Sequence, residues 1–256
     1  MQNKVRADFF NKCLDFQKVT AIGEKKFHDY SSIFVLVLNC IILYICYNTT
    51  MIKKINKNKW LNKPARYSKN TLTIDGYQVM QRWEYPYMAD LAKIVSTNGG
   101  SVLEIGFGMG ISAGYIQKDK KVAKHTIIEC HPQVAARALK EFRKQIKDGK
   151  LIIINAFWED VVPNFKNNIF DGILFDSFEP YEAQLSDFIK EAHRILKRGG
   201  IFTYFSSEYK TMSQDHVQEL KEAGFKKIDY RLCPIKPPKY CEYWKKSFIL
   251  SPIIIK

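Results

Sequence analysis

The stretch Ser101-Val-Leu-Glu-Ile-Gly-Phe-Gly-Met-Gly110 joins a buried-strand pattern to a glycine turn and the start of a helix. Residues 102–105 form a short apolar run, interrupted by one acid, that is typical of a central parallel strand. Three glycines follow at every second position: Gly106, Gly108 and Gly110. Without a Cβ, the backbone there can turn sharply and approach a ligand closely. The pattern predicts a nucleotide-cofactor turn at the N-terminus of a helix. The alternative is a glycine-rich turn that holds nothing.

Strand and helix patterns alternate on both sides of this stretch. Apolar runs typical of strands lie at 101–105, 125–129, 151–154, 170–175 and 201–205. Helical periodicity lies at 78–95, 132–146, 185–196 and 214–223, and two closing strands are expected at 226–232 and 247–250. The alternation predicts an α/β fold with a doubly wound, seven-stranded, Rossmann-like sheet, in which ligands sit outside the carboxyl ends of the strands.

The composition indicates one α/β domain with an N-terminal extension. The chain has 256 residues, 46% of them hydrophobic, which excludes disorder for most of it. The net charge is +14, but residues 1–70 hold 13 Lys/Arg against 4 Asp/Glu, and residues 71–256 hold 27 against 22. We therefore expect a basic extension over 1–70, an α/β domain over 71–256 and no nucleic-acid partner. The six cysteines show no metal-ligand spacing, so we expect free thiols in a reducing compartment and no metal.

The extension contains an apolar segment, residues 31–47, that has 17 residues without a charge. This is at the short end of a membrane span, which needs roughly 17–25 residues. Seven basic residues and no acid follow between residues 53 and 69, so a spanning segment would leave the C-terminal domain in the cytoplasm. The alternatives are a helix packed on the domain, or upstream sequence absent from the mature protein, with Met51 as the true start. The sequence does not predict the oligomeric state.

Acidic residues fall at or shortly after the ends of successive predicted strands. They are Glu104, Glu129, Glu159 and Asp176. Carboxyl ends of parallel strands meet at one edge of a sheet, and a buried acid without a partner is costly. Converging acids at this edge therefore predict a ligand or hydrogen-bond donors that satisfy them.

The spacing of these residues favours S-adenosylmethionine as the cofactor. Glu129 lies 19 residues beyond Gly110, where an acid in this architecture reaches the ribose hydroxyls of a nucleoside. A dinucleotide would more often show the G-x-G-x-x-G spacing and a following substrate domain. The adenine would stack on Trp158, and Glu159 would accept its exocyclic amine. For Trp158, the alternative is plain core packing.

Asp176 lies where the methyl acceptor is expected. The proline-rich clamp typical of methyltransferases that act on nucleic-acid amines is absent after this strand, and a free carboxylate suggests a cationic acceptor. Glu84 offers a second carboxylate on the helix pattern that precedes the glycine stretch. Pro86 would bend that helix and turn Glu84 inward. The alternative is that Glu84 pairs with Arg82 or a surface lysine.

Several motifs together resemble one family. They are Arg82-Trp-Glu-x-Pro-Tyr-Met88, Val102-Leu-Glu-Ile-Gly-Phe-Gly-Met109, Ile127-Ile-Glu-Cys130, Trp158-Glu-Asp160, Phe170-Asp-Gly-Ile-Leu-Phe-Asp176 and Pro237-Pro-x-x-Cys-x-Tyr243. From about residue 70 onward the chain resembles guanidinoacetate N-methyltransferase, the creatine-forming family, and the glycine turn with Glu-Cys-His-Pro is also similar to the fungal-type protein arginine methyltransferase that modifies the inner guanidine nitrogen.

The resemblance implies catalytic roles for Asp176, as general base, and Glu84, which holds the guanidinium. It implies S-adenosylmethionine binding by Glu104, Gly106, Gly108, Met109, Gly110, Glu129, Cys130, Trp158, Glu159 and Asp176. It implies acceptor contacts from Trp83, Glu84, Met88, Ser206 and Ser207.

The loop at 206–210 departs from the family, because Glu208 would repel an acceptor carboxylate unless Lys210 compensates. We therefore expect an N-methyltransferase for a small guanidino or cationic amine compound. The alternatives are a protein arginine N-methyltransferase and a membrane-attached, non-catalytic S-adenosylmethionine-binding protein.

Overall fold

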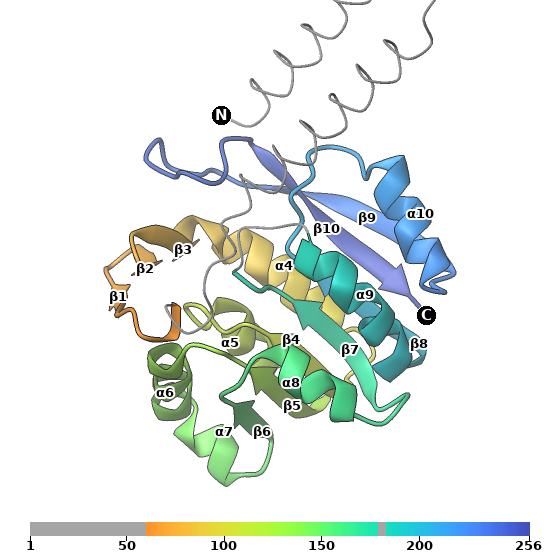
Figure 1. Ribbon diagram of the computed structural model, residues 1–256, viewed down its shortest axis with the longest axis horizontal. Helices are drawn as coiled ribbons and strands as arrows, with labels where there is room; N and C mark the ends of the chain where they lie inside the picture. Colours follow the sequence, from red (N-terminus) through yellow and green to blue (C-terminus); the bar gives the residue numbers. More distant parts are fainter. Residues whose placement is uncertain (1–59, 179–182) are drawn as a thin grey trace, which may run out of the picture. The chain divides into compact units, whose positions relative to one another are not determined.

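The computed structural model describes residues 60–178 and 183–256, and its main feature is a seven-stranded sheet (Figure 1). The strand order is β6-β5-β4-β7-β8-β10-β9. The bounds are β4 (Gly100–Ile105), β5 (Val122–Ile128), β6 (Leu151–Ile154), β7 (Phe170–Phe175), β8 (Leu196–Tyr204), β9 (Lys227–Pro234) and β10 (Phe248–Ile255). The first five strands in this order are parallel, and β10 is antiparallel to both β8 and β9. The predicted α/β fold is thus confirmed, and the two closing strands form a β9–β10 hairpin.

Helices cover both faces of this sheet. Successive strand residues point to opposite sides, and the apolar side chains on each side are buried by helices. Val102 and Leu174 face one core, which α4, α5 and α6 cover, whereas Leu103 and Ile173 face the other, which α8, α9 and α10 cover. The bounds are α4 (Tyr85–Val95), α5 (Ile111–Lys118), α6 (Pro132–Glu141), α7 (Arg143–Lys147), α8 (Trp158–Val161), α9 (Ala183–Ile195) and α10 (Gln214–Glu222). The arrangement brings the ends of β4, β5 and β7 to one edge.

A small three-stranded antiparallel sheet precedes α4 and replaces the start of the predicted helix at 78–95. Its strands are β1 (Ala65–Tyr67), β2 (Thr71–Ile74) and β3 (Tyr77–Gln81), and a 3-10 turn, η1 (Arg82–Glu84), links it to α4. The expected bend at Pro86 is also wrong. Pro86 lies in the first turn of α4, where its missing N–H would have no helical partner, so it begins the helix without kinking it.

Other element boundaries differ from the predicted ones by a few residues. The helix predicted at 132–146 is divided at Phe142 into α6 and α7, and β8 begins at Leu196, five residues before the strand predicted at 201–205. No helix within residues 60–178 and 183–256 is long and apolar enough to cross a membrane. The predicted anchor at 31–47 lies outside the described residues.

Candidate active site

The glycine turn between β4 and α5 has the backbone conformation that the sequence predicts. Gly106, Gly108 and Gly110 have φ values of +87°, +54° and +72°, which side chains with a Cβ rarely adopt. A Cβ on Gly106 would lie 2.1 Å from the carbonyl oxygen of Asp176. The turn therefore packs directly against the chain that leaves β7, and Gly106 allows that approach. Met109 donates its N–H to the Met80 sulfur at 3.1 Å, which fastens the turn to β3.

Glu129 joins this turn to the end of β5. The side chain is 7% exposed, and its two oxygens accept the N–H groups of Phe107 and His131, both at 2.8 Å. Burial raises the pKa of Glu129, and these donors counteract the rise. Hydrogen bonds from the Gly108 N–H and the Cys130 side chain add to these two, so four donors hold the carboxylate beside the turn. Next to it, Cys130 is partly exposed, and its carbonyl accepts the Asn155 side-chain N–H at 3.0 Å.

Glu104 lies beneath the turn, fully buried. It accepts the hydroxyl of Ser112 on α5, and its other oxygen lies 2.9 Å from Nε2 of the equally buried His125 on β5. These contacts tie α5 to the sheet. Contact between Glu104 and a cofactor stays a prediction. The negative charge of Glu104 nevertheless contributes to the raised pKa of Asp176.

Asp176 directly follows β7 and faces several negative charges. Its N–H donates to the Ile105 carbonyl at 2.9 Å, which holds it beside the glycine turn. Burial raises the pKa of Asp176 to about 7, and the nearby charges of Glu104 and Glu129 add to the rise. A carboxyl group with this pKa can exchange a proton near neutral pH.

Glu84 reaches the same region from η1, and its side chain is 2% exposed. One oxygen, Oε1, accepts the Gln81 N–H at 2.7 Å and the Tyr243 hydroxyl. Burial raises the pKa of Glu84 to about 8, and the charge of Asp176 contributes to the rise. A buried acid, Glu84, and a partly buried acid, Asp176, from separate segments therefore influence each other, and the described residues supply neither with an ion-pair partner.

The neighbours of Glu84 on the same segment lie in different surroundings. The Trp83 indole N–H donates to the Gln81 side chain at 2.8 Å, and its ring centroid lies 5.8 Å from that of Tyr243. Met88 is fully buried in the core beneath α4. Trp83 is thus near the acid pair, whereas an acceptor contact by Met88 stays a prediction.

Trp158 begins α8 and belongs to the core on the other face of the sheet. Its indole is 7% exposed, and it meets the rings of Phe175 and Phe188 edge-on at centroid distances of 6.1 and 5.1 Å. This packing agrees with the alternative that we left open for Trp158. Adenine stacking by Trp158 and an adenine contact by the partly buried Glu159 stay predictions.

The loop after β8 contains the departures from the family pattern. Ser206 is buried, donates its N–H to the Tyr87 hydroxyl at 3.0 Å and accepts the Glu208 N–H at 3.1 Å, whereas Ser207 is exposed. Glu208 accepts the Ser213 N–H at 2.6 Å. The Lys210 ammonium lies 5.3 Å from the centre of the Tyr209 ring, so it is held over an aromatic face. No ion pair between Glu208 and Lys210 occurs in this part of the described chain.

Trp60 also lies near the site, and the sequence pattern does not predict this. Its ring stacks on Phe178, two residues beyond Asp176, at a centroid distance of 5.3 Å, and meets His131 edge-on at 6.3 Å. Trp60 thereby bridges the loops that follow β7 and β5. The Tyr67 hydroxyl adds a bond to the Gly108 carbonyl at 3.0 Å. Both residues fall in the range assigned to the basic extension, and the isolated tryptophan among lysines is the signal that could have identified them.

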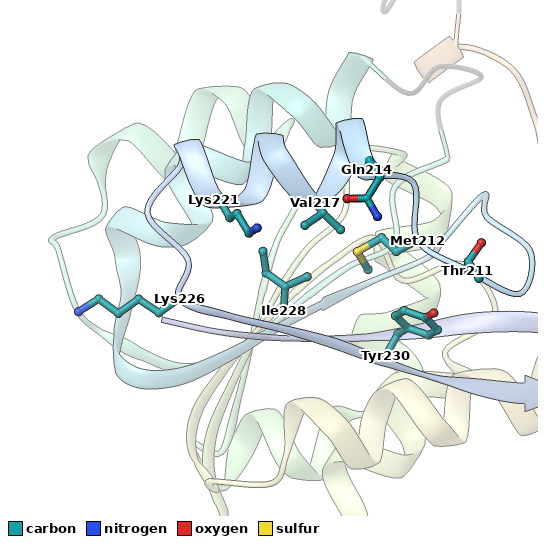
Figure 2. Close-up of a pocket in the computed structure, with 8 residues that line it drawn as sticks. All are labelled: Thr211, Met212, Gln214, Val217, Lys221, Lys226, Ile228 and Tyr230. Carbon is teal, nitrogen blue, oxygen red and sulfur yellow. The ribbon is translucent and has the colours of Figure 1, made fainter.

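A separate cavity of about 420 Å³ lies between α10 and β9 (Figure 2). Met212, Val217 and Ile228 form its apolar part, and Lys221 lies on the α10 side. None of the predicted site residues lines this cavity. The acid cluster at the ends of β4, β5 and β7 is therefore the candidate active site.

The residues around the glycine turn fit S-adenosylmethionine. Burial raises the pKa of Asp176, the negative charges of Glu104 and Glu129 add to the rise, and a cofactor with a positive sulfonium would counteract both charges. Glu129 is held at the end of β5 against the Phe107 N–H of the turn, where an acid of this architecture reaches a ribose.

Comparison with known proteins identifies the family. A family model described as guanidinoacetate N-methyltransferase matches residues 52–256. The chain belongs to this family. The match confirms the resemblance found in the sequence and, with it, S-adenosylmethionine as the cofactor of the family.

The curated relatives of this guanidinoacetate N-methyltransferase family member carry another name. The chain is 31% identical over 183 residues to protein arginine N-methyltransferase 2 of Emericella nidulans, covering 67% of the chain and 42% of that protein. It is 30% identical over 199 residues to the protein of the same name from Aspergillus oryzae, covering 70% of the chain and 47% of that protein. The chain thus spans less than half the length of these relatives.

Solved structures support the fold. Spermidine synthase from Thermotoga maritima has a TM-score of 0.53 at 23% identity, covering 72% of this chain and 65% of that one. A spermidine synthase in complex with the transition-state analogue AdoDATO has a TM-score of 0.54 at 21% identity, covering 72% and 64%. At this identity, the similarity concerns the fold alone.

Proposed function

We propose that this chain transfers the methyl group of S-adenosylmethionine to a nitrogen of a guanidino group. The observation that carries the proposal is the buried Glu84 close to the partly buried Asp176: burial raises the pKa of Glu84, and the charge of Asp176 adds to the rise. A guanidinium is a planar cation with several N–H donors, which carboxylate oxygens accept in strong, charge-assisted hydrogen bonds. A guanidinium acceptor would provide both carboxylates with a cationic partner.

The cofactor, when bound, supplies an electrophilic methyl group on a positively charged sulfur. The glycine turn and Glu129 would hold it, with Glu129 accepting the ribose hydroxyls. Trp158 and Glu159 are the proposed adenine contacts. Trp60 would cover this region, because it bridges the loops after β5 and β7.

Asp176 and Glu84 have different roles toward the acceptor. A guanidinium has a pKa above about 12 and no free lone pair, so its nitrogen becomes nucleophilic only as a proton is withdrawn. Asp176, which lies beside the glycine turn, accepts that proton as general base, and Glu84 holds the planar cation. Holding the acceptor nitrogen close to the methyl group would provide much of the rate enhancement.

The acceptor is either a small guanidino compound such as guanidinoacetate, after the family description, or an arginine side chain of a protein, after the names of the relatives. The loop at 206–210 favours the second. In the family resemblance this loop faces the acceptor carboxylate, and here Lys210 lies over Tyr209 and leaves the charge of Glu208 uncompensated. An acceptor without a carboxylate at that position avoids the repulsion.

The test is methyl transfer by the purified full chain from radiolabelled S-adenosylmethionine to guanidinoacetate and, separately, to an arginine-containing peptide. Transfer to either compound supports the proposal and identifies the acceptor class. Transfer to neither, with cofactor binding intact by calorimetry, would contradict guanidino chemistry at this site.

Substitution of the two acids tests their roles. Glu84→Gln and Asp176→Asn should each lower kcat by at least about a hundredfold, the order that general acid–base catalysis contributes. The dissociation constant for S-adenosylhomocysteine should stay within a few-fold. Glu141→Gln is the matched control, since Glu141 lies on the surface in an exposed ion pair with Arg137. Loss of cofactor binding with unchanged kcat would show that the roles are misassigned.

A further inference from the structure

A hydroxyl from the loop between β9 and β10 contacts the acid that is proposed to hold the acceptor. Tyr243 donates its O–H to Oε1 of Glu84, and the Gln81 N–H donates to the same oxygen at 2.7 Å. Oε2 has no donor among the described residues. Glu84 therefore has one oxygen that is fully engaged and one that is available to a ligand.

The position of Tyr243 is fixed by backbone contacts of its own loop. The Gln78 side chain on β3 donates to the Tyr240 carbonyl at 3.1 Å and accepts the Glu242 N–H at 3.0 Å. Cys241, between them, is fully buried. A single glutamine thus attaches the loop to β3, and the turn that carries Glu84 follows directly after this strand.

The surroundings of Tyr243 keep its hydroxyl protonated. Burial raises the pKa of Tyr243 above its ordinary range, and the charges of Glu84, Cys241 and Asp176 add to the rise. Tyr243 is thus a permanent donor to Glu84. A donor to the ionised form of a carboxyl group favours ionisation, and the hydrogen bond from Tyr243 accordingly lowers the pKa of Glu84 against the effect of burial.

We propose that Tyr243 is a positioning residue that orients the Glu84 carboxylate, leaving Oε2 to accept an N–H at the edge of the acceptor guanidinium. This role rests on the proposed function. An ionised Glu84 is required to hold a cation, and Tyr243 supports both the charge and the orientation. The charged and titratable groups that face Glu84 are Asp176, from the end of β7, and Tyr243 itself.

The test is Tyr243→Phe in the full chain, which removes one hydroxyl and keeps the ring. We expect kcat/KM for the guanidino acceptor at pH 7 to fall about tenfold or more, the order of a hydrogen bond to a charged group. The acidic limb of the pH profile should move to higher pH, while the affinity for S-adenosylhomocysteine stays the same. Tyr240→Phe is the matched control, because this ring in the same loop is 56% exposed and should leave kcat/KM unchanged.

A double-mutant cycle separates positioning from general structural damage. If Tyr243 acts through Glu84, then Tyr243→Phe in a Glu84→Gln background should have little further effect on acceptor binding. Additive losses, or an unchanged pH profile in the single variant, would overturn the proposal. Should Tyr243→Phe fail to fold, Gln78→Ala is the alternative test. It removes the side chain that attaches the loop to β3 and leaves the tyrosine itself unchanged. It should then shift the same limb of the profile, and no shift would overturn the proposal.

A spectroscopic readout keeps this inference distinct from the proposed function. In protein labelled with ¹³C at the glutamate carboxyl carbon, the Glu84 signal can be assigned by its loss in Glu84→Gln. Tyr243→Phe should raise its titration midpoint even if no guanidino compound is methylated. An unchanged midpoint would refute the role of Tyr243, whereas a raised midpoint without methyl transfer would refute only the reaction.

Discussion

At the scale of single residues, the site is shaped by the cost of burying negative charge. Asp176 is partly buried and Glu84 fully buried, neither has an ion-pair partner among the described residues, and burial raises their pKa values to about 7 and about 8. A structural ion pair would have lowered these values. Raised values in a pair of neighbouring acids instead suggest a site that awaits positive charge from a ligand.

The pH dependence of catalysis should follow this pair. Both acids are neutral at low pH and ionise as the pH rises, and only the ionised forms hold and deprotonate a guanidinium. With cofactor saturating, kcat/KM for the acceptor should rise by up to about a hundredfold per pH unit below both pKa values, because two protons must leave, and level off above about pH 8. The two values belong to the coupled pair, so the midpoint is that of the pair. A profile that is flat from pH 5 to pH 9 would contradict the assignment.

Part of this site could be predicted because parallel strands end at one edge of a sheet. Glu129 and Asp176 lie at the ends of β5 and β7, and the charge of Glu129 reaches Asp176. Trp60 and the Tyr243 hydroxyl bond could not be predicted in this way. They come from irregular segments whose approach depends on tertiary contacts, and no periodic pattern records such contacts.

At the scale of elements, the largest difference from the prediction is the strand at the start of the expected helix at 78–95. Val79 and Met80 fit either periodicity, and the neglected signal is Asp75-Gly76, which has φ values of 50° and 84° between β2 and β3. Asp-Gly between apolar runs favours a tight hairpin. The long parallel strands were easier to predict, because each is an apolar run bounded by glycine or polar residues.

The element that is most sensitive to substitution should be the glycine turn. Gly106→Ala places a Cβ at φ +87° and 2.1 Å from the Asp176 carbonyl oxygen, so either the turn or the β7 end must move. We expect the affinity for S-adenosylhomocysteine to fall at least about tenfold, as positive φ and a steric clash act together. Gly114→Ala in α5 is the control, because a Cβ there has no neighbour within 4 Å. Calorimetry on both variants is the measurement, and equal affinities would contradict a role for the turn.

At the scale of the whole molecule, the chain is basic overall, whereas the candidate active site is acidic. The chain carries a net charge of +14, yet Glu84, Glu104, Glu129 and Asp176 gather at one edge of the sheet. The basic residues lie disproportionately in the first 70 residues. The overall charge therefore says little about the ligands of the site, and the local acids suggest that both cofactor and acceptor are cationic.

Acceptor binding should consequently be coupled to proton release. At pH 7 the free site retains protons on Glu84 and Asp176, and a bound guanidinium lowers both pKa values and expels part of them. Calorimetry of guanidinoacetate or an arginine peptide, with S-adenosylhomocysteine present to prevent turnover, should give an apparent enthalpy that differs between phosphate and Tris buffers at pH 7. The difference should vanish near pH 10, where both acids are already ionised, and shrink in Glu84→Gln. Equal enthalpies in both buffers at pH 7, with binding observed, would mean that the acceptor does not contact this pair.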